Sequence, residues 1–183
     1  MIKTVIIFIT GLMGLVLLVS AFSAKEYGVE REIIINKPCT EVFNFVKILR
    51  NQDQYSAWKF RDKSMKSSFK GTDGTIGFIS SWESEDGKSS KGEQEIIGME
   101  ENHKINFELR FEKPVKSTSN TYMITEIVSP AATKVKWGFK GKMSFPINIM
   151  LLFMDMEGPI KNDFDEGLKN LKSLLESQKT PEK

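Results

Sequence analysis

Few side chains in this 183-residue chain are of a type and spacing that could carry out chemistry. The single histidine, His103, lies in a polar Glu-Asn-His-Lys stretch, which is typical of a solvated turn between two strands. The single cysteine, Cys39, follows Pro38 at an expected helix start, and we interpret it as a buried, inert thiol. One cysteine and one histidine cannot form an internal disulfide, a Cys/His zinc site or a two-histidine metal site. We therefore predict no metal and no cofactor, and we assign no catalytic residue.

Carboxylates are the remaining candidates for acid–base chemistry. Asp155 and Glu157 lie in the segment FMDMEGP, just before an expected C-terminal helix. A carboxylate at the mouth of an apolar cavity could act as general acid or base, because burial raises a carboxyl pKa. Asp163, Asp165 and Glu166 fall in the first turns of that helix, where they favourably oppose the helix dipole. An enzyme that uses a cavity carboxylate is therefore one alternative for this chain.

Glycine and lysine patterns carry no nucleotide or nucleic-acid signal. The spacing of Gly71, Gly74 and Gly77 fits neither common phosphate-binding glycine motif, so we interpret these residues as turn formers. Lys134, Lys136, Lys140 and Lys142 alternate with apolar residues, which is typical of a solvated sheet face. The formal net charge is only +2, spread along the chain in stretches of mixed sign. Nucleic-acid binding needs a larger basic footprint, and we predict none.

An uncharged run of 21 residues, Thr4 to Ala24, lies between Lys3 and Lys25. As a helix it would span about 30 Å, the thickness of the hydrocarbon core of a bilayer. A retained membrane anchor is favoured over a cleaved signal peptide, because the run is longer than a usual signal core and Phe22 interrupts the small residues near Ala24. The positive N-terminus and Lys3 favour a cytoplasmic N-terminus. We therefore expect a single-pass membrane protein whose folded domain is extracytoplasmic.

The rest of the chain predicts one α+β domain of about 150 residues, a common domain size. Residues 1–25 are the anchor or signal peptide, 29–177 the domain, and 178–183 a polar tail. A short linker is expected at residues 25–28 and a polar, aromatic-containing loop at 50–63. An Asp86-Gly87 pair predicts a hairpin turn. The patterns predict a strand at 29–35, a helix at 40–49, and strands at 65–70, 75–84, 92–100, 104–111, 120–128 and 133–142.

A long amphipathic helix is predicted from Pro159 onward. Its apolar residues fall on one face: Ile160, Phe164, Leu168, Leu171, Leu174 and Leu175. The only large apolar surface available to bury this stripe is the concave face of the antiparallel sheet. Gly167 beside the stripe permits a close backbone approach or a slight bend of the helix, at a cost of ~1 kcal/mol relative to alanine.

This order of elements is that of the helix-grip fold, a curved antiparallel sheet wrapped around a long C-terminal helix. Several segments resemble membrane-anchored bacterial members of the START/Bet v 1-like (SRPBCC) superfamily, in its polyketide cyclase/dehydrase-like branch. They are VEREIIINKPCTEVFNFV, WESEDGKSSKGEQEI, VKWGFKGKMSFP, LLFMDM and DFDEGLKNLKSLLE. The resemblance covers nearly the whole chain from Val29. It implies an internal cavity, in a superfamily that includes ligand carriers, cyclases and hydrolases.

A cavity between sheet and helix would be lined or filled by inward aromatic and methionine side chains. The candidate ligand contacts are Trp58, Phe60, Phe78, Trp82, Phe107, Phe111, Trp137, Phe139, Met150 and Met154. The leading hypothesis is that the protein binds or carries a hydrophobic small molecule or lipid at a membrane surface. The alternatives are a cyclase- or hydrolase-like enzyme and an interaction module whose cavity is filled core. An open pocket of about 300 Å³ or more is the property that a ligand site requires.

Overall fold

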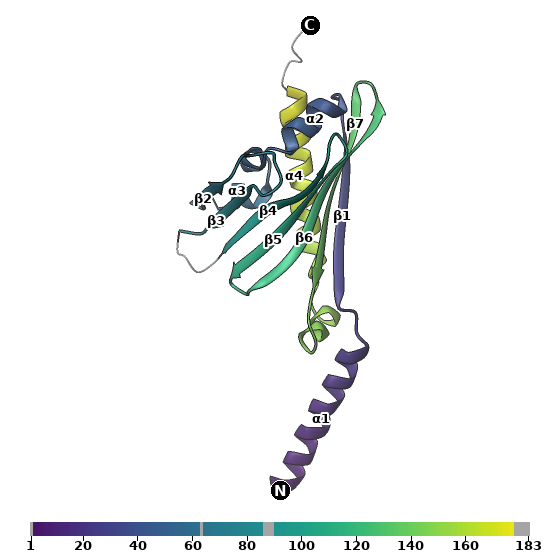
Figure 1. Ribbon diagram of the computed structural model, residues 1–183. Coiled ribbons are helices and arrows are strands. Elements are labelled where there is room, and N and C mark those ends of the chain that lie inside the picture. The colour runs from purple at the N-terminus through teal and green to yellow at the C-terminus, as the bar shows by residue number, and fades with distance from the viewer. Residues whose placement is uncertain (1, 63, 86–89, 178–183) are drawn as a thin grey trace.

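The computed structural model describes residues 2–62, 64–85 and 90–177 (Figure 1). In chain order the elements are α1 (Ile2–Phe22), β1 (Glu26–Ile35), α2 (Cys39–Val46), η1 (Leu49–Gln54), α3 (Ala57–Arg61), β2 (Lys66–Lys70), β3 (Ile79–Glu83), β4 (Lys91–Glu100), β5 (Lys104–Lys113), β6 (Ser117–Ser129), β7 (Ala132–Lys142), η2 (Ile147–Leu152) and α4 (Glu157–Ser177), where η denotes a 3₁₀ helix. The turn expected at Asp86-Gly87 and the polar tail at 178–183 lie outside the described residues.

The described strands form one seven-stranded antiparallel sheet in the order β1-β7-β6-β5-β4-β3-β2. Strands β2 to β7 are a meander, since each pairs with the next along the chain. The first strand closes the other edge by pairing with β7, with Val29 opposite Phe139 and Ile35 opposite Thr133. The long helix α4 runs along one face of this sheet (Figure 1). The α+β helix-grip fold predicted from the sequence is confirmed.

Alternating side chains on the inner strands form the core. Ile105 and Phe107 on β5, and Val135 and Trp137 on β7, are buried, as the period-two pattern predicts. The apolar stripe of α4 packs against them, with Phe164, Leu168, Leu171 and Leu175 buried. Gly167 allows this packing, because a Cβ atom there would lie 2.9 Å from Cζ3 of Trp137.

The outer face of the sheet is polar, which agrees with the interpretation of its lysines. Lys136 Nζ lies 2.7 Å from Oε1 of Glu126, while Lys140 and Lys142 are exposed. Arg110 on β5 forms ion pairs with three carboxylates, those of Glu93, Glu95 and Glu108, at 2.6 to 2.7 Å. These pairs lie on the face opposite the core and are typical of a solvated surface.

Four sequence expectations about element boundaries are wrong. Residues 26–28 are not a linker, because β1 begins at Glu26, which pairs with Lys142. The helix expected at 40–49 ends at Val46, and the strand expected from Thr75 begins at Ile79. The expected loop at 50–63 contains η1 and α3, because Tyr55 and Ala57 are fully buried and hold this segment against the core. Strand pairing explains the first difference and tertiary burial the last, and local sequence patterns report neither.

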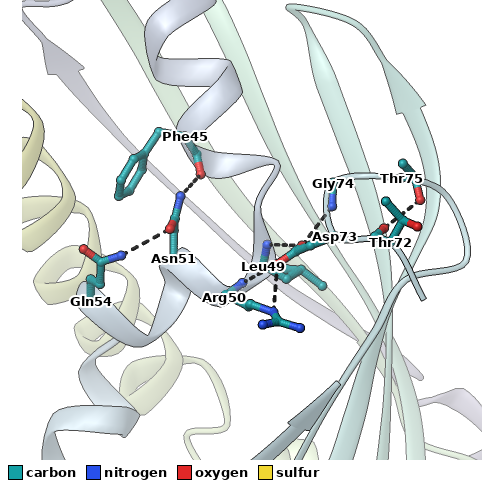
Figure 2. Close-up of polar contacts among 9 residues, drawn as sticks. All are labelled: Phe45, Leu49, Arg50, Asn51, Gln54, Thr72, Asp73, Gly74 and Thr75. Atoms are coloured by element: carbon teal, nitrogen blue, oxygen red, sulfur yellow. Dashed lines mark hydrogen bonds and ion pairs between the residues drawn. The ribbon is translucent and has the colours of Figure 1, made fainter. Parts of the chain in front are cut away.

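Asp73 fixes the position of η1 (Figure 2). Its carboxylate accepts hydrogen bonds from the backbone N–H groups of Leu49 and Arg50, at 2.8 and 3.1 Å, and from Gly74 N at 2.8 Å. Arg50 Nε lies 3.7 Å from the same carboxylate. Gly74 has a φ of +76°, which lets the chain turn here. The β2–β3 connection thereby caps the start of η1, which agrees with the turn-forming role predicted for its glycines.

Helix α1 extends away from the sheet and is long and apolar enough to cross a membrane (Figure 1). Its window of highest hydropathy has only 6% of its residues buried within the structure. A signal sequence near an N-terminus has the same two properties. The described helix therefore agrees with the expected apolar segment and does not assign the side of the membrane on which the domain lies.

Candidate ligand cavity

A cavity of about 450 Å³ lies between the inner face of the sheet and the layer formed by η1, α3 and α4. Helix α4 contributes Ile160, Asp163 and Phe164 to its wall, and η1 contributes Leu49, Gln52 and Asp53. The other lining residues are Tyr27, Ser56, Trp58, Lys59, Met65, Ser67, Ser80, Trp82, Ser90, Gln94, Leu109, Phe111, Lys113, Pro114, Val115, Ser117, Ser119, Thr121, Trp137 and Phe139. Its volume lies within the range of small-molecule sites in proteins.

One end of the cavity is an aromatic cluster around Trp137. The Trp137 ring stacks on Phe164, with centroids 4.5 Å apart and planes inclined by 9°. Trp58 from α3 meets Trp137 edge-on at 5.5 Å, and Tyr55 does so at 5.8 Å. Only 1% of Trp137 is exposed, so its ring also belongs to the core. Such aromatic pairs contribute to stability beyond the area that they bury, so this end of the wall is well packed.

A second aromatic pair lines the cavity nearer the β2 edge of the sheet. Trp82 on β3 meets Phe111 on β5 edge-on, with centroids 5.6 Å apart. The indole Nε1 of Trp82 donates to the hydroxyl oxygen of Ser90 at 3.0 Å. Trp82 is only half-buried. Its ring is therefore more accessible to a ligand than that of Trp137.

Charged groups at the cavity wall are held by partners. Lys59 Nζ donates to the backbone oxygen of Met65 at 3.0 Å and to Oγ of Ser67 at 2.8 Å. The same ammonium lies 3.6 Å from the carboxylate of Asp53. Asp163 forms an ion pair with Arg61 at 2.5 Å. These contacts join α3 to η1, β2 and α4, and they hold the short helices in place around the cavity.

Two buried polar groups in the lining have no hydrogen-bond partner among the described residues. They are Oγ of Ser56 and Nε2 of Gln94, in side chains that are 1% and 6% exposed. Gln52 is a less clear case, because its side chain interacts with the hydroxyl of Tyr55, whose pKa burial raises well above its usual value. A buried donor without a partner costs about 1–3 kcal/mol. Both side chains line the cavity, but the two polar atoms have almost no surface open to it, so a guest molecule reaches them only after the side chains rotate.

The structure distributes the ten residues predicted as ligand contacts over three environments. Five line the cavity: Trp58, Trp82, Phe111, Trp137 and Phe139. Phe78 and Phe107 are fully buried in the core and are absent from the lining. Phe60, Met150 and Met154 are exposed and lie outside the lining, the two methionines in or beside η2. Ligand contact stays a prediction for the first five.

Of the carboxylates considered in the sequence, Asp163 lines the cavity, where it is paired with Arg61, and the two proposed as acid or base lie outside it. Asp155 and Glu157 are absent from its lining. The pKa of Glu157 is lowered, not raised as expected for a cavity acid, because Lys161 Nζ and the backbone N–H of Gly28 both bond its carboxylate. His103 is exposed in the turn between β4 and β5. Cys39 is buried, with Sγ 3.3 Å from the backbone oxygen of Asn102.

Sequence reasoning missed the polar part of the lining. Leu109, Ile160 and Phe164 could have been selected, since they follow the inward alternation of β5 and the stripe of α4. Ser56 and Gln94 carry no comparable signal, because a serine or glutamine at these spacings is ordinary in any globular chain. Their common environment exists only once α3 is folded onto the sheet.

No family model matches this chain, and no curated protein matches its sequence. Solved structures do match its fold. The chain aligns with Ara h 8.0201 at a TM-score of 0.59 and 12% identity, over 84% of this chain and 99% of that one. It aligns with protein CV1439 from Chromobacterium violaceum at 0.59 and 12%, over 82% and 98%. DynU16, from the dynemicin biosynthetic locus, aligns at 0.53 and 15%, over 82% of this chain and 47% of its own.

These likenesses establish the class of fold. The protein has a Bet v 1-like helix-grip fold, which is the fold that the resemblance noted in the sequence implied. At identities of 12 to 15% the likeness concerns fold alone. Fold does not determine function, so the function has to be argued from the cavity.

Proposed function

We propose that this protein binds or carries a hydrophobic small molecule or lipid in the cavity between its sheet and α4. The observation that carries the proposal is the cavity itself, which is about 450 Å³ in volume and has a mainly apolar wall surface, although half of its lining residues are polar. A filled core, the property of a pure interaction module, would leave no space of this size. The fold adds support, because the helix-grip arrangement separates the sheet from the helix and so makes room for a guest.

The cavity also narrows the chemistry of the ligand. Gln94 Nε2 and Ser56 Oγ lack partners, and both are hydrogen-bond donors. A ligand with an apolar body and an acceptor oxygen, such as a carbonyl, would satisfy one of them after its side chain rotates, while the rings or chains of the ligand contact the apolar part of the lining. We therefore propose a hydrophobic ligand that carries a carbonyl or similar acceptor group, in preference to a pure hydrocarbon.

A pair of ligands with the same carbon skeleton tests this proposal. Full-length protein in lipid nanodiscs, which avoid detergent in the cavity, is titrated with fluorenone and with fluorene while tryptophan emission is followed. We expect both to bind and fluorenone to bind about tenfold more tightly, since a hydrogen bond to a buried group contributes about 1–1.5 kcal/mol. Empty nanodiscs correct for partitioning into lipid.

Substitutions of lining residues test whether the preference for fluorenone arises in the cavity. Gln94→Leu should remove most of the preference for fluorenone, whereas Gln54→Leu, the same change at an exposed position of η1, should retain it. Ser119→Leu, which adds volume to the lining, should weaken both ligands. Binding no stronger than to empty nanodiscs would sink the carrier proposal. Equal affinity for fluorenone and fluorene would contradict only the proposal that the ligand carries an acceptor oxygen, and would leave the carrier proposal in place.

We also propose that α1 is a retained anchor and that the domain lies on the extracytoplasmic side. The length and apolar character of α1 support the anchor, and the charge distribution around it supports the orientation. The full-length protein should stay in the membrane fraction after alkaline carbonate washing. A soluble species that begins near Ala24 or Lys25 would mean a cleaved signal. Protease added to intact and to lysed cells tests the side of the domain.

A further inference from the structure

The segment around η2 exposes a group of large apolar side chains that the cavity does not use. They are Phe145, Ile147, Met150, Leu152, Phe153 and Met154, and the most exposed is Phe153, at 81%. We call this group the η2 patch. Contiguous exposed apolar side chains on a folded domain mark a contact with another protein or with a membrane. The exposure of six such side chains within ten residues therefore indicates that the η2 patch contacts another protein or a membrane.

The η2 patch lies at the end of the domain from which α1 emerges (Figure 1). The β6–β7 hairpin lies at the opposite end. Exposed Lys25 and Lys142 are close to the same junction, since Met143 N donates to Lys25 O at 2.8 Å. Apolar side chains bordered by lysines at the end of an apolar helix are an arrangement suited to the interface of a bilayer.

A buried polar contact joins η2 to α1. Asn148 is fully buried, and its Nδ2 lies 2.8 Å from Ser20 O and 3.3 Å from the backbone oxygens of Ser23 and Ala24. The hydroxyl of Ser20 lies 2.5 Å from Asn148 Oδ1 and 2.9 Å from Pro146 O, and donates to one of them at a time. Asn148 thus donates to backbone carbonyl groups at and just beyond the C-terminal end of α1, one of which, Ser20 O, also accepts from Ser23 N.

We infer that the η2 patch is a second membrane contact, held against the bilayer by the contact between Asn148 and the end of α1. This inference rests on the membrane anchoring proposed above and is independent of the cavity. The occupant is the lipid interface, because the patch continues the apolar surface of α1 at the level where that helix leaves the bilayer. The patch thereby sets the height and tilt of the domain above the membrane.

Depth-dependent quenching tests the inference in full-length protein. Phe153→Cys is made in a Cys39→Ser background, labelled with the fluorophore NBD, and reconstituted into phosphatidylcholine vesicles containing nitroxide-labelled lipid. Leu12→Cys in α1 is the positive control, and Ile127→Cys, an equally exposed site on β6 near the β6–β7 hairpin, is the negative control. If Cys39→Ser does not fold, Cys39 is kept, since it is buried.

We expect strong quenching at positions 12 and 153, and at least threefold less at 127. Quenching at 12 alone would overturn the inference while leaving the anchor in place. Quenching at none of the three would overturn both. A blue-shifted but unquenched label at 153 would assign the patch to a protein contact, such as a second copy of the chain, and would also overturn the inference.

The role of Asn148 is tested by the same readout. Asn148→Ala should reduce quenching at position 153 by half or more, because η2 is no longer joined to the end of α1. Ser144→Ala, an exposed change in the same segment, should leave it unchanged. Undiminished quenching in Asn148→Ala would refute the coupling of η2 to α1.

Discussion

The side chain of Trp137 on β7 is stacked face to face on Phe164 of α4, with ring centroids 4.5 Å apart. This contact joins the sheet to the long helix at the point where the cavity begins. Trp137 therefore belongs both to the hydrophobic core and to the wall of the cavity. Substitutions of Trp137 should therefore affect both stability and ligand binding. A comparison with a substitution elsewhere in the cavity wall separates the two effects.

Trp137→Ala should destabilise the protein by about 3–5 kcal/mol, because it leaves a large void beside Phe164 and Trp58. Trp82→Ala should cost less, since Trp82 is half-buried at the cavity wall, and should instead weaken ligand binding. Chemical denaturation of the protein in nanodiscs measures the loss of stability in each variant, and the fluorenone titration measures the loss of binding. A loss below about 1 kcal/mol for Trp137→Ala would contradict the role of its ring in joining sheet and helix.

Gly167→Ala should destabilise the protein although alanine is the better helix former. The new Cβ would lie 2.9 Å from Trp137 Cζ3, and overpacking of this kind costs about 1–3 kcal/mol, more than the ~1 kcal/mol gained in helix propensity. Ser173→Ala, on the exposed face of α4, is the control and should be neutral or slightly stabilising. A rise in stability for Gly167→Ala would show that α4 can move away from the sheet.

Asp73→Ala should loosen η1, because the N–H groups of Leu49 and Arg50 lose their acceptor (Figure 2). Loss of such a cap costs about 0.5–2 kcal/mol. Hydrogen exchange should report faster exchange at these two amides, and ligand affinity should fall because η1 lines the cavity. Asp73→Asn keeps an acceptor oxygen and should have a smaller effect. Unchanged protection of both amides in Asp73→Ala would be inconsistent with this role.

Glu176 should make a pH-dependent contribution to stability. Its pKa lies below the usual 4.5, chiefly because the backbone N–H of Asn36 donates to its carboxylate, at 2.7 Å, and also because Lys172 is adjacent. A carboxyl group with a lowered folded-state pKa stabilises the protein fully above its unfolded pKa, and this contribution is lost as the pH falls through the folded value.

Glu176→Gln should therefore be less stable than the wild type at pH 7, and the two proteins should converge as the pH falls below 4.5 and through the lowered pKa of Glu176. Thermal unfolding measured across this pH range checks the expectation. Glu166→Gln, which changes the charge by the same amount elsewhere on α4, is the control for net charge. A difference that stays constant with pH would mean that the carboxylate charge is not involved.

The order of elements, the inward faces of the strands and the buried stripe of α4 could be predicted from the amino-acid sequence alone. These properties follow from local periods, two residues in a strand and 3.6 in a helix, which can be read along the chain. They placed Trp82, Phe111, Trp137 and Phe139 on the surfaces that meet in the cavity. The same local patterns misplaced residues 50–63, where burial of Tyr55 and Ala57 outweighs a loop-like composition.

Local patterns could not predict which inward side chains line the cavity and which fill the core. Phe107 and Phe111 lie on the same face of β5, yet the first is buried in the core and the second lines the cavity. Asn148 and Ser20 are 128 residues apart and share a buried hydrogen bond. Such pairings depend on how far the sheet and helices stand from one another, a distance set by the sum of all packing contacts and by no single stretch of sequence.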